Sequence, residues 1–304
     1  MFNNSNITSL PSNLTHITSL SIQYTNITSI PLSYINLIYL DANDAIKLTE
    51  IPEFSINLKV LKCNYTNIKS IPDTLVNLEY IECMRCNNLC KLPNVLNKLK
   101  YINCNDSYNL TVLPCSSVYE FINCSNTNIT VIPKSPIKEL ICNCAIDTIP
   151  TLEKLIISNV SMSLCNLYKL KWLTCINCII ELFNVPYLTV LHLSNTKINN
   201  MIELNNVKRL SLSYLNNINM KITSLKYLEL YNTSFIMNNY NKVISIKAFH
   251  SDLVLNGLDN LKYLKLNKCN IEIVKLLKNI KSIKTDLYTF QSLPLEYYKY
   301  TIIN

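Results

Sequence analysis

The residues of this 304-residue sequence best suited to chemistry are its 13 cysteines. C-x-x-C pairs occur at 83–86 and 175–178, and a single residue separates Cys142 from Cys144. Such spacings occur in zinc sites, in which thiolate sulfurs surround the ion at about 2.3 Å. The cysteines therefore raise the hypothesis of a metal centre, which depends on whether the fold brings the pairs together.

Acid–base catalysis has few candidate residues. Three histidines are present, His16, His192 and His250, and the sequence places none of them beside a matched nucleophile. A general base has to lie within hydrogen-bonding reach of the proton that it removes. Glu79 and Glu82 are close in sequence, but a solvated charged patch accounts for this pair. The sequence therefore predicts no catalytic residues and no enzymatic activity.

The sequence has one glycine, Gly257. Phosphate-binding loops, dinucleotide-binding fingerprints, kinase glycine loops and nucleophile elbows all need glycines at fixed offsets, because the backbone there turns tightly or touches a ligand. These sites are excluded, and no cofactor is expected. Turns that need a positive φ angle have to use another residue, and we expect asparagine, the next most tolerant residue.

The composition, 49% hydrophobic and 16% charged, is that of a chain that folds around a core. No apolar run approaches the roughly 18 residues of a membrane span, and the first residues lack the features of a secretory signal. Together with the odd number of cysteines, this favours an intracellular, cytoplasmic location. Charge is uneven, because residues 1–150 carry 10 basic and 11 acidic side chains and residues 151–304 carry 18 and 9.

A repeat of about 20 residues runs through the chain. Prolines that each follow Leu or Ile mark it at positions 11, 31, 52, 72, 93, 114, 133 and 150. One copy, from Leu58 to Pro72, reads L-x-x-L-x-C-x-x-T-x-I-x-x-I-P, and copies without the proline begin at Leu188, Leu225 and Leu261. About 14 or 15 units can be placed between residues 7 and 285.

The repeat offers a second explanation for the cysteines. Six occupy the third apolar position of a unit and four the position three residues later, and both positions face the core. The first set is Cys63, Cys83, Cys104, Cys124, Cys142 and Cys175, and the second is Cys86, Cys144, Cys178 and Cys269. The two C-x-x-C pairs lie about five units apart, roughly 24 Å at the spacing of adjacent strands, which is too far to share a zinc ion. We expect buried core cysteines and no metal.

These units resemble the leucine-rich repeat family, whose pattern L-x-x-L-x-L-x-x-N/C-x-L recurs every 20–29 residues. The short period and the Ile-Pro or Leu-Pro ending most resemble the small repeats of bacterial effectors. The abundance of Asn and Ile resembles the mimivirus-like leucine-rich repeat proteins of giant DNA viruses. Thr, Ser or Cys mostly replaces the family's asparagine; a hydroxyl there can bond the backbone of a neighbouring repeat, whereas a thiol does so only weakly.

The resemblance implies a single α/β-type repeat solenoid over residues 1–304. A curved parallel β-sheet is expected on its concave face, irregular or 3-10 segments on its convex face, and little α-helix. The alternation within L-x-L suits a strand with one buried face, and stacked units share a continuous core. The aromatic segment 286–304 is expected to cap the C-terminal end of the sheet.

Partners of leucine-rich repeat proteins bind the concave sheet, so its outward-facing residues set the chemistry of binding. The residue before the second apolar position is often aromatic. With a nearby arginine, these residues make the predicted binding site: Tyr39, Tyr80, Tyr101, Phe121, Trp172, Arg209, Tyr227 and Tyr263. Tyr, Trp and Arg dominate interface energetics, but Tyr also suits strands and stacks there on its neighbours, so a purely structural role stays open.

The sequence thus predicts a monomeric, non-enzymatic protein–protein interaction module. Its partner is expected to be a protein with an acidic surface, and a host protein if the chain is viral. One alternative is nucleic-acid binding through the basic C-terminal half; it is less favoured because the lysines are spread singly and the pI is 8.7. The other is a substrate-recognition subunit for an enzyme elsewhere. No membrane contact is expected.

Overall fold

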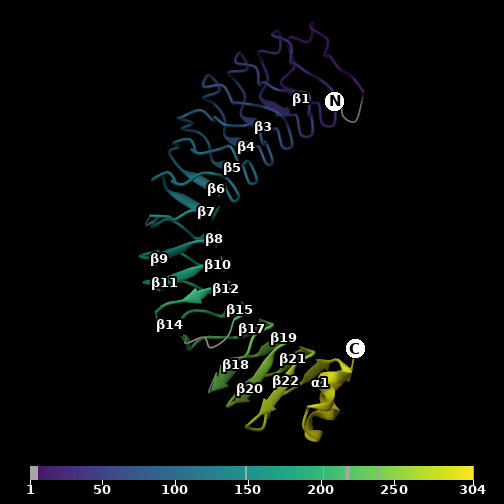
Figure 1. The fold of residues 1–304 in the computed structure, drawn as a ribbon, viewed down its shortest axis with the longest axis vertical. Coiled ribbons are helices and arrows are strands. Elements are labelled where there is room, and N and C mark those ends of the chain that lie inside the picture. The colour runs from purple at the N-terminus through teal and green to yellow at the C-terminus, as the bar shows by residue number, and fades with distance from the viewer. Residues whose placement is uncertain (1–5, 148, 201, 216–219, 239, 304) are drawn as a thin grey trace. The chain divides into compact units, whose positions relative to one another are not determined.

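A computed structural model describes residues 6–147, 149–200, 202–215, 220–238 and 240–303. The chain forms two compact units, Met1–Leu152 and Glu153–Asn304, called unit 1 and unit 2 below. Each unit is a parallel β-solenoid in which successive repeats stack on one another (Figure 1). The predicted fold class, a leucine-rich repeat solenoid with little α-helix, is therefore confirmed. The single-domain organisation stays a prediction.

Unit 1 carries one short strand per repeat, and these strands pair in parallel, in chain order, as the main sheet of the unit. The strands are β1 (Ser19–Ser21), β2 (Tyr39–Asp41), β3 (Val60–Lys62), β4 (Tyr80–Glu82), β5 (Tyr101–Asn103), β6 (Tyr119–Asn123) and β7 (Ile137–Cys142). Register partners from β1 to β6 are 20 or 21 residues apart, which is the period that the prolines mark.

The apolar position of each strand points into the core, and its neighbours in sequence point the opposite way, onto what we call the open face of the main sheet. In unit 1 the core residues are at most 3% exposed: Leu20, Leu40, Leu61, Ile81, Ile102, Ile122 and Leu140. They are register partners on successive strands, so each repeat buries its apolar face against the next one, as stacked repeats require.

Unit 2 has the same kind of main sheet. Its strands are β8 (Lys154–Ser158), β10 (Trp172–Ile176), β12 (Val190–Ser194), β15 (Arg209–Ser213), β17 (Tyr227–Tyr231), β19 (Ser245–Phe249), β21 (Tyr263–Asn267), β23 (Ser282–Thr285) and β24 (Thr301–Ile303). From β8 to β23 the register partners are 18 or 19 residues apart, so these repeats are shorter than those of unit 1.

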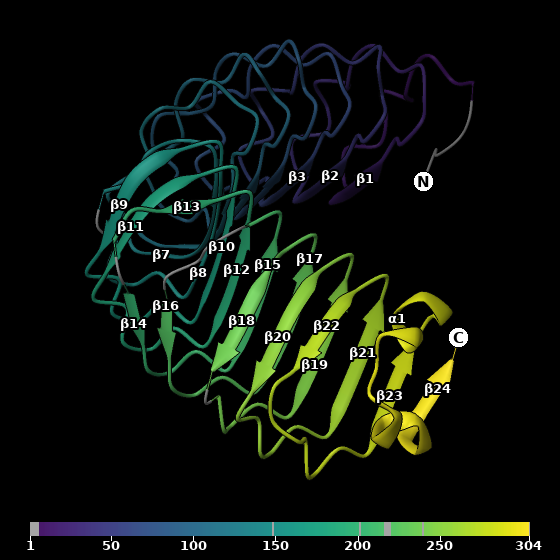
Figure 2. The same cartoon turned by 60° about the horizontal axis from the view of Figure 1, so that its bottom comes forward.

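Most repeats of unit 2 carry a second strand on the side opposite the main sheet (Figure 2). The second strands form three small sheets: β9 (Ser161–Cys165) with β11 (Ile179–Phe183) and β13 (Lys197–Ile198); β14 (Ile202–Leu204) with β16 (Met220–Ile222); and β18 (Phe235–Asn238) with β20 (Asp252–Asn256) and β22 (Asn270–Ile273). The expectation of irregular segments on this side therefore holds for unit 1, whereas unit 2 has short strands there.

The distribution of proline explains this difference between the units. The repeats of unit 1 end in Ile-Pro or Leu-Pro, and proline has no N–H to donate to a neighbouring strand. Unit 2 contains only Pro186 and Pro294, so the backbone opposite its main sheet is free to pair from repeat to repeat.

Residues with positive φ occupy the tight turns that follow the main strands and, at Asn166, Asn184 and Gly257, the second strands of unit 2. In unit 1 they are Tyr24, Asp44, Tyr65, Arg85, Asp106 and Asn126, so the expectation that asparagine takes these turns is wrong for most of this unit. In unit 2 asparagine does predominate: Asn159, Asn166, Asn177, Asn184, Asn195 and Asn232, beside Tyr214, His250, Gly257 and Lys268. Stacking imposes the conformation, because the turn residue donates its N–H to the next repeat, as Tyr65 does to the carbonyl of Met84 (2.9 Å).

Hydroxyl side chains link the repeats at the position where the family pattern has asparagine. Oγ1 of Thr196 accepts the N–H of Cys178 (3.3 Å) and donates to the carbonyl of Cys175 (3.1 Å), both in the preceding repeat. A thiol also reaches the preceding repeat, because Sγ of Cys86 donates to the carbonyl of Cys63 (2.9 Å). The predicted bonds from hydroxyls to a neighbouring repeat are confirmed.

The last residues of unit 2 form a short helix α1 (Leu287–Gln291), a 3-10 helix η1 (Leu295–Tyr300) and strand β24, which pairs with β23. The buried hydroxyl of Tyr297 accepts the N–H of Leu277 (2.8 Å), and Oγ1 of Thr289 accepts the N–H of Cys269 (2.9 Å). These contacts fix the segment to the preceding repeats. Its role as a cap stays a prediction.

Candidate functional site

The structure places all eight predicted binding residues on the open faces of the main sheets. Seven of them are the first residue of a main strand, which for Tyr39, Tyr80 and Tyr101 is a three-residue strand of unit 1. Phe121 is the middle residue of β6. They are Tyr39, Tyr80, Tyr101 and Phe121 in unit 1, and Trp172, Arg209, Tyr227 and Tyr263 in unit 2. Whether they bind a partner stays a prediction.

Three of these residues form one continuous stack in unit 1. The rings of Tyr80 and Tyr101 have centroids 4.2 Å apart and lie within 4° of parallel, and those of Tyr101 and Phe121 are 4.7 Å apart at 12°. All three are half-buried and are register partners on β4, β5 and β6. Tyr39 does not join them, because its register partner on β3 is Val60.

Charged side chains border the stack. The hydroxyl of Tyr80 donates to Glu82 on the same strand, and Nζ of Lys62 lies 3.7 Å from Glu82 and 5.5 Å from the centroid of the Tyr80 ring. Burial, and then the hydrogen bond to Glu82, raise the pKa of Tyr80 above its ordinary value. The phenol therefore stays protonated and remains a donor at neutral pH.

In unit 2, Trp172 is the centre of a second aromatic contact. Its indole N–H donates to Oγ1 of Thr174 (2.9 Å), Nζ of Lys154 lies 5.8 Å from its ring centroid, and the ring of His192 lies 5.0 Å away. These contacts hold the ring in one orientation at the half-buried surface of β10.

Further along unit 2, the guanidinium of Arg209 lies 5.5 Å from the ring centroid of Tyr227 on the next strand. Tyr263 is 49% exposed and lies between two small register partners, Ser245 and Ser282. The predicted residues of unit 2 are therefore arranged singly or in pairs rather than as one stripe.

Sequence reasoning missed a second stack, formed by Tyr231 and Phe249, whose parallel rings are 5.1 Å apart. They lie at the last outward position of β17 and β19, four residues after the first residue of each strand, where the predicted binding residues lie. Tyr231 and Phe249 are 18 residues apart, which is the period of unit 2, so their contact could have been predicted from this separation.

The three histidines lie on separate repeats and differ in their exposure. His16 and His250 are exposed, and His250 takes a positive-φ turn. Nε2 of His192 is buried and has no hydrogen-bond partner, so it activates no hydroxyl or thiol. Burial lowers the pKa of His192, which keeps the ring neutral at neutral pH.

Nine of the ten cysteines assigned to core columns are buried, as predicted, and Cys144 is half-buried. Cys90 and Cys115, which lie outside these columns, are exposed. Among the described residues, no group of three or more His, Cys, Asp or Glu side chains is placed to hold a metal ion. The four cysteines of the two C-x-x-C pairs are all buried in the core.

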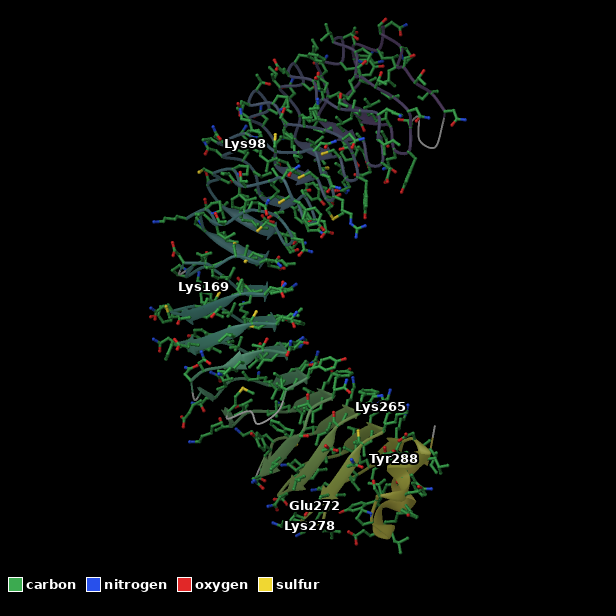
Figure 3. All side chains as sticks on the ribbon, in the orientation of Figure 1. Lys98, Lys169, Lys265, Glu272, Lys278 and Tyr288 are labelled. Atoms are coloured by element: carbon green, nitrogen blue, oxygen red, sulfur yellow. The ribbon has the colours of Figure 1, made fainter. Side chains whose placement is uncertain are left out.

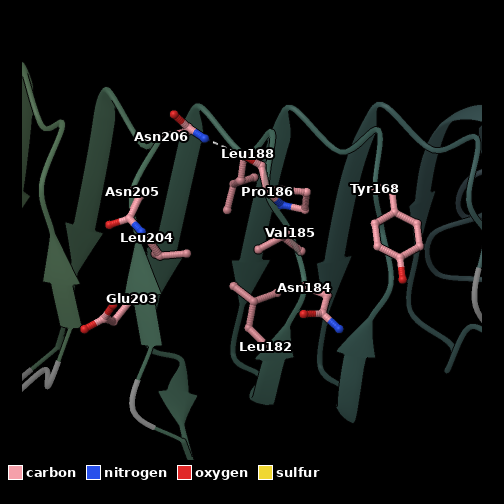
Figure 4. A pocket seen from close by; sticks show the side chains of 10 residues that line it. All are labelled: Tyr168, Leu182, Asn184, Val185, Pro186, Leu188, Glu203, Leu204, Asn205 and Asn206. Carbon is pink, nitrogen blue, oxygen red and sulfur yellow. Dashed lines mark hydrogen bonds between the residues drawn. The ribbon is translucent and has the colours of Figure 1, made fainter.

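A cleft of about 350 Å³ lies between two repeats of unit 2, beside β14 (Figure 4). Its polar groups already have partners within the protein: Glu203 pairs with Lys221 (2.7 Å), and the amide of Asn206 donates to the carbonyl of Pro186 (2.6 Å). This cleft therefore offers no concentration of free polar groups to a ligand.

No helix of the described residues is long and apolar enough to cross a bilayer. No protein-family model matches the sequence, and the comparison with curated proteins found no significant match. The chain is similar in structure to several solved leucine-rich repeat proteins. A leucine-rich repeat protein of Leptospira interrogans is 16% identical, with a TM-score of 0.44 over 89% of this chain and 90% of that one.

Two further solved structures are similar over most of the chain. The functional domain of InlJ from Listeria monocytogenes, which includes a cysteine ladder, is 17% identical, with a TM-score of 0.47 over 88% of this chain and 67% of that one. A plant peptide hormone receptor, RGFR1, in complex with RGF2, is 12% identical, with a TM-score of 0.35 over 91% of this chain and 77% of that one. The resemblance to giant-virus proteins stays a prediction.

Proposed function

We propose that the chain is a protein-interaction module without enzymatic activity, and that its partner binds the open faces of the main sheets, the concave side of a leucine-rich repeat solenoid. The observation that carries this proposal is the continuous half-buried surface of Tyr80, Tyr101 and Phe121. Tyrosine and tryptophan are over-represented among the residues that dominate binding energy at interfaces.

The stack supports binding because its rings are already ordered. A side chain that is held in one rotamer before binding loses little conformational entropy when a partner covers it. Tyr101 has a ring on each side, and the hydroxyl of Tyr80 is held by Glu82. Trp172 is held in a similar way by Thr174 and by the ring of His192.

The charge of unit 2 indicates the chemistry of the partner. Residues 151–304 carry 18 basic and 9 acidic side chains, so we propose that the partner presents acidic groups where it meets this unit. The absence of enzymatic activity is supported by His192, whose Nε2 atom has no hydrogen-bond partner among the described residues. A substrate-recognition subunit of an enzyme elsewhere would use the same surface.

The test is quantitative capture of proteins from an extract of the native host by the immobilised chain, followed by reconstitution with each purified candidate. Tyr101→Ala and Trp172→Ala remove one aromatic residue from each unit's open face. We expect a partner that binds the unaltered chain to bind at least one of these variants about tenfold more weakly, as for a residue that contributes to an interface core.

The matched controls are Tyr108→Ala and Tyr187→Ala, which remove residues that are 55% and 63% exposed and lie outside the main sheets. Thermal unfolding has to confirm that all four variants are folded. If every protein captured by the unaltered chain binds all four variants equally well, the open faces are not the binding surface and the proposal is wrong.

A further inference from the structure

Several lysines on the surface of the solenoid pair with a carboxylate on an adjacent repeat. Parallel strands lie about 4.8 Å apart, so side chains at equivalent positions of adjacent repeats are neighbours, and opposite charges there attract. The pairs are Lys59 with Glu79 (3.0 Å), Lys62 with Glu82 (3.7 Å), Lys100 with Glu120 (3.9 Å), Lys171 with Glu153 (2.9 Å), Lys221 with Glu203 (2.7 Å) and Lys247 with Glu229 (2.9 Å).

Four lysines on the last repeats of unit 2 break this pattern. Lys265 on β21 is the register partner of Lys284 on β23. Lys262 and Lys281 directly precede these strands and are joined through the backbone, N–H of Lys281 to the carbonyl of Lys262 (2.8 Å). No carboxylate of the described residues lies within 4.0 Å of any of the four ammonium groups. We call Lys262, Lys265, Lys281 and Lys284 the lysine block.

The lysine block lies on the open face of unit 2. Lys265, Lys281 and Lys284 are exposed and Lys262 is half-buried. Figure 3 shows Lys265 on the main-sheet side of the unit, whereas Glu272 and Lys278 lie on the opposite side. Glu272 therefore does not neutralise the block.

The positive surface continues from the block toward β15. Lys247 on β19 is the register partner of Lys265, and its own partner Glu229 is the only acidic residue at the outward positions of β15, β17, β19, β21 and β23. Lys226 and Arg209 add further positive charge on the preceding repeats. The block is thus one end of a positive surface several strands wide.

An unneutralised block of this kind disfavours the folded state, because like charges directly opposite one another repel. The six pairs above avoid this cost, because a glutamate stands opposite each lysine on the adjacent repeat. Like charges that meet on adjacent repeats without a compensating contact violate a local rule, and such violations are typical of functional surfaces.

We propose that the lysine block binds an acidic segment of a protein partner, with two or more carboxylates placed between the paired lysines of β21 and β23. This inference rests on the proposed function and names the chemistry of the partner at one place on the open face. Residues of an extended segment are about 3.3 Å apart, so alternate side chains are spaced closely enough to follow lysines on adjacent strands.

The neighbouring aromatic residues favour carboxylates over a nucleic acid. Bases bind proteins by stacking on exposed ring faces. Tyr231 and Phe249 stack on one another, Nζ of Lys265 lies 5.7 Å from the Phe249 ring, and Arg209 covers Tyr227. The faces of these three rings are thus occupied, and their remaining edges carry partial positive charge, which suits anions. Tyr263, 49% exposed between Ser245 and Ser282, is a ring of β21 left open to a base, and the oligothymidylate probe below tests it.

The test uses a fluorescent peptide of alternating Glu and Ser, about ten residues long, which when extended is longer than the roughly 10 Å that three adjacent strands span. Binding is measured by fluorescence anisotropy at about 0.15 M salt, where weak long-range attraction is screened. The comparison probes are the same peptide with Gln in place of Glu, and an oligothymidylate with the same number of negative charges. We expect only the Glu peptide to bind well.

The variant is the double substitution Lys265→Gln and Lys284→Gln, and its matched control is Lys275→Gln with Lys278→Gln. Both lower the net charge equally, but Lys275 and Lys278 are exposed outside the main sheet. We expect the first variant to bind the Glu peptide about tenfold more weakly and the control to change affinity by less than about twofold.

Three results would overturn the proposal: no binding of the Glu peptide by the unaltered chain, equal losses in both variants, or tighter binding of the oligothymidylate than of the peptide. The last would assign the block to a nucleic acid. None of these results alters the capture experiment with Tyr101→Ala and Trp172→Ala, so failure here is distinguishable from failure of the proposed function.

Discussion

Lys265 and Lys284 are register partners on adjacent parallel strands, and neither ammonium group has a carboxylate within 4.0 Å among the described residues. The pair is therefore a source of repulsion within the folded unit. Substituting Lys284→Gln removes this repulsion without removing a packed side chain, because Lys284 is exposed.

We expect Lys284→Gln to stabilise unit 2 by about 0.5 kcal/mol at low ionic strength, the size of a close pair of like charges on a sheet. The gain should disappear at about 1 M salt, at which the screening length falls to about 3 Å. Thermal unfolding at both salt concentrations measures it, with Lys278→Gln as the control. An equal gain in both variants would mean that only net charge matters.

Tyr101 is the central ring of the stack in unit 1, so Tyr101→Ala removes two ring contacts. We expect the free energy of unfolding of unit 1 to fall by about 2 kcal/mol, since each stacked pair contributes about 1 kcal/mol beyond its buried area. Urea denaturation measures the change. Tyr101→Phe should retain most of the stability, and an unaltered midpoint for Tyr101→Ala would mean that the rings do not stabilise one another.

Thr196 links two repeats through one buried hydroxyl, so Thr196→Val tests the hydroxyl ladder at nearly constant volume. The N–H of Cys178 loses its acceptor, and we expect a loss of about 1–3 kcal/mol for the unsatisfied buried group. The control is Thr189→Val, whose exposed hydroxyl donates to the carbonyl of Lys171 (3.0 Å) and can bond water instead. Thermal midpoints compare the two, and equal shifts would contradict the ladder.

The buried thiol of Cys104 should resist alkylation in the folded protein. Burial raises its pKa to about 12, whereas Cys90 and Cys115 are exposed. Because the thiolate is the reactive form, iodoacetamide at about pH 8 should modify the exposed pair first and Cys104 only after denaturation. Peptide mass spectrometry before and after denaturation measures this order. Early labelling of Cys104 would contradict the assigned register.

Alkaline pH should destabilise unit 1 through the same thiol. The ordinary pKa of a cysteine is about 8.5, so above it the unfolded chain loses a proton that folded Cys104 keeps until about pH 12. The stabilising effect is complete below about pH 8.5 and is lost as the pH rises, by up to about 1.4 kcal/mol per pH unit. Cys104→Ser, whose hydroxyl does not titrate, should show a shallower decline of the thermal midpoint between about pH 9 and 11.

The core of this protein could be predicted from the sequence because its period is nearly constant. Leu20, Leu40 and Leu61 recur at equivalent positions, and only a buried apolar column explains that recurrence. The same reasoning correctly placed Cys83 and Cys86 in the core. The period also placed Tyr80 and Tyr101 on the outward side of their strands.

The contacts between outward side chains could not be read from the period alone. Tyr39, Tyr80 and Tyr101 occupy equivalent positions, but only Tyr80 and Tyr101 are on adjacent strands, and Val60 isolates Tyr39. The predicted binding residues all come from one position of the repeat, and the stack of Tyr231 and Phe249 lies at a different position, so it was not predicted. Equivalent positions become contacts only where adjacent repeats both carry the residue.

The turns show the same division. Asparagine was expected wherever φ is positive, yet Tyr65 and Arg85 take these turns in unit 1, because hydrogen bonds to the next repeat hold the backbone. The sequence by itself determined the repeat and its buried columns, since apolar burial follows from local spacing. Only the tertiary structure decided which rings stack, which lysines remain without a carboxylate and where second strands form, because stacking sets which side chains of different repeats meet.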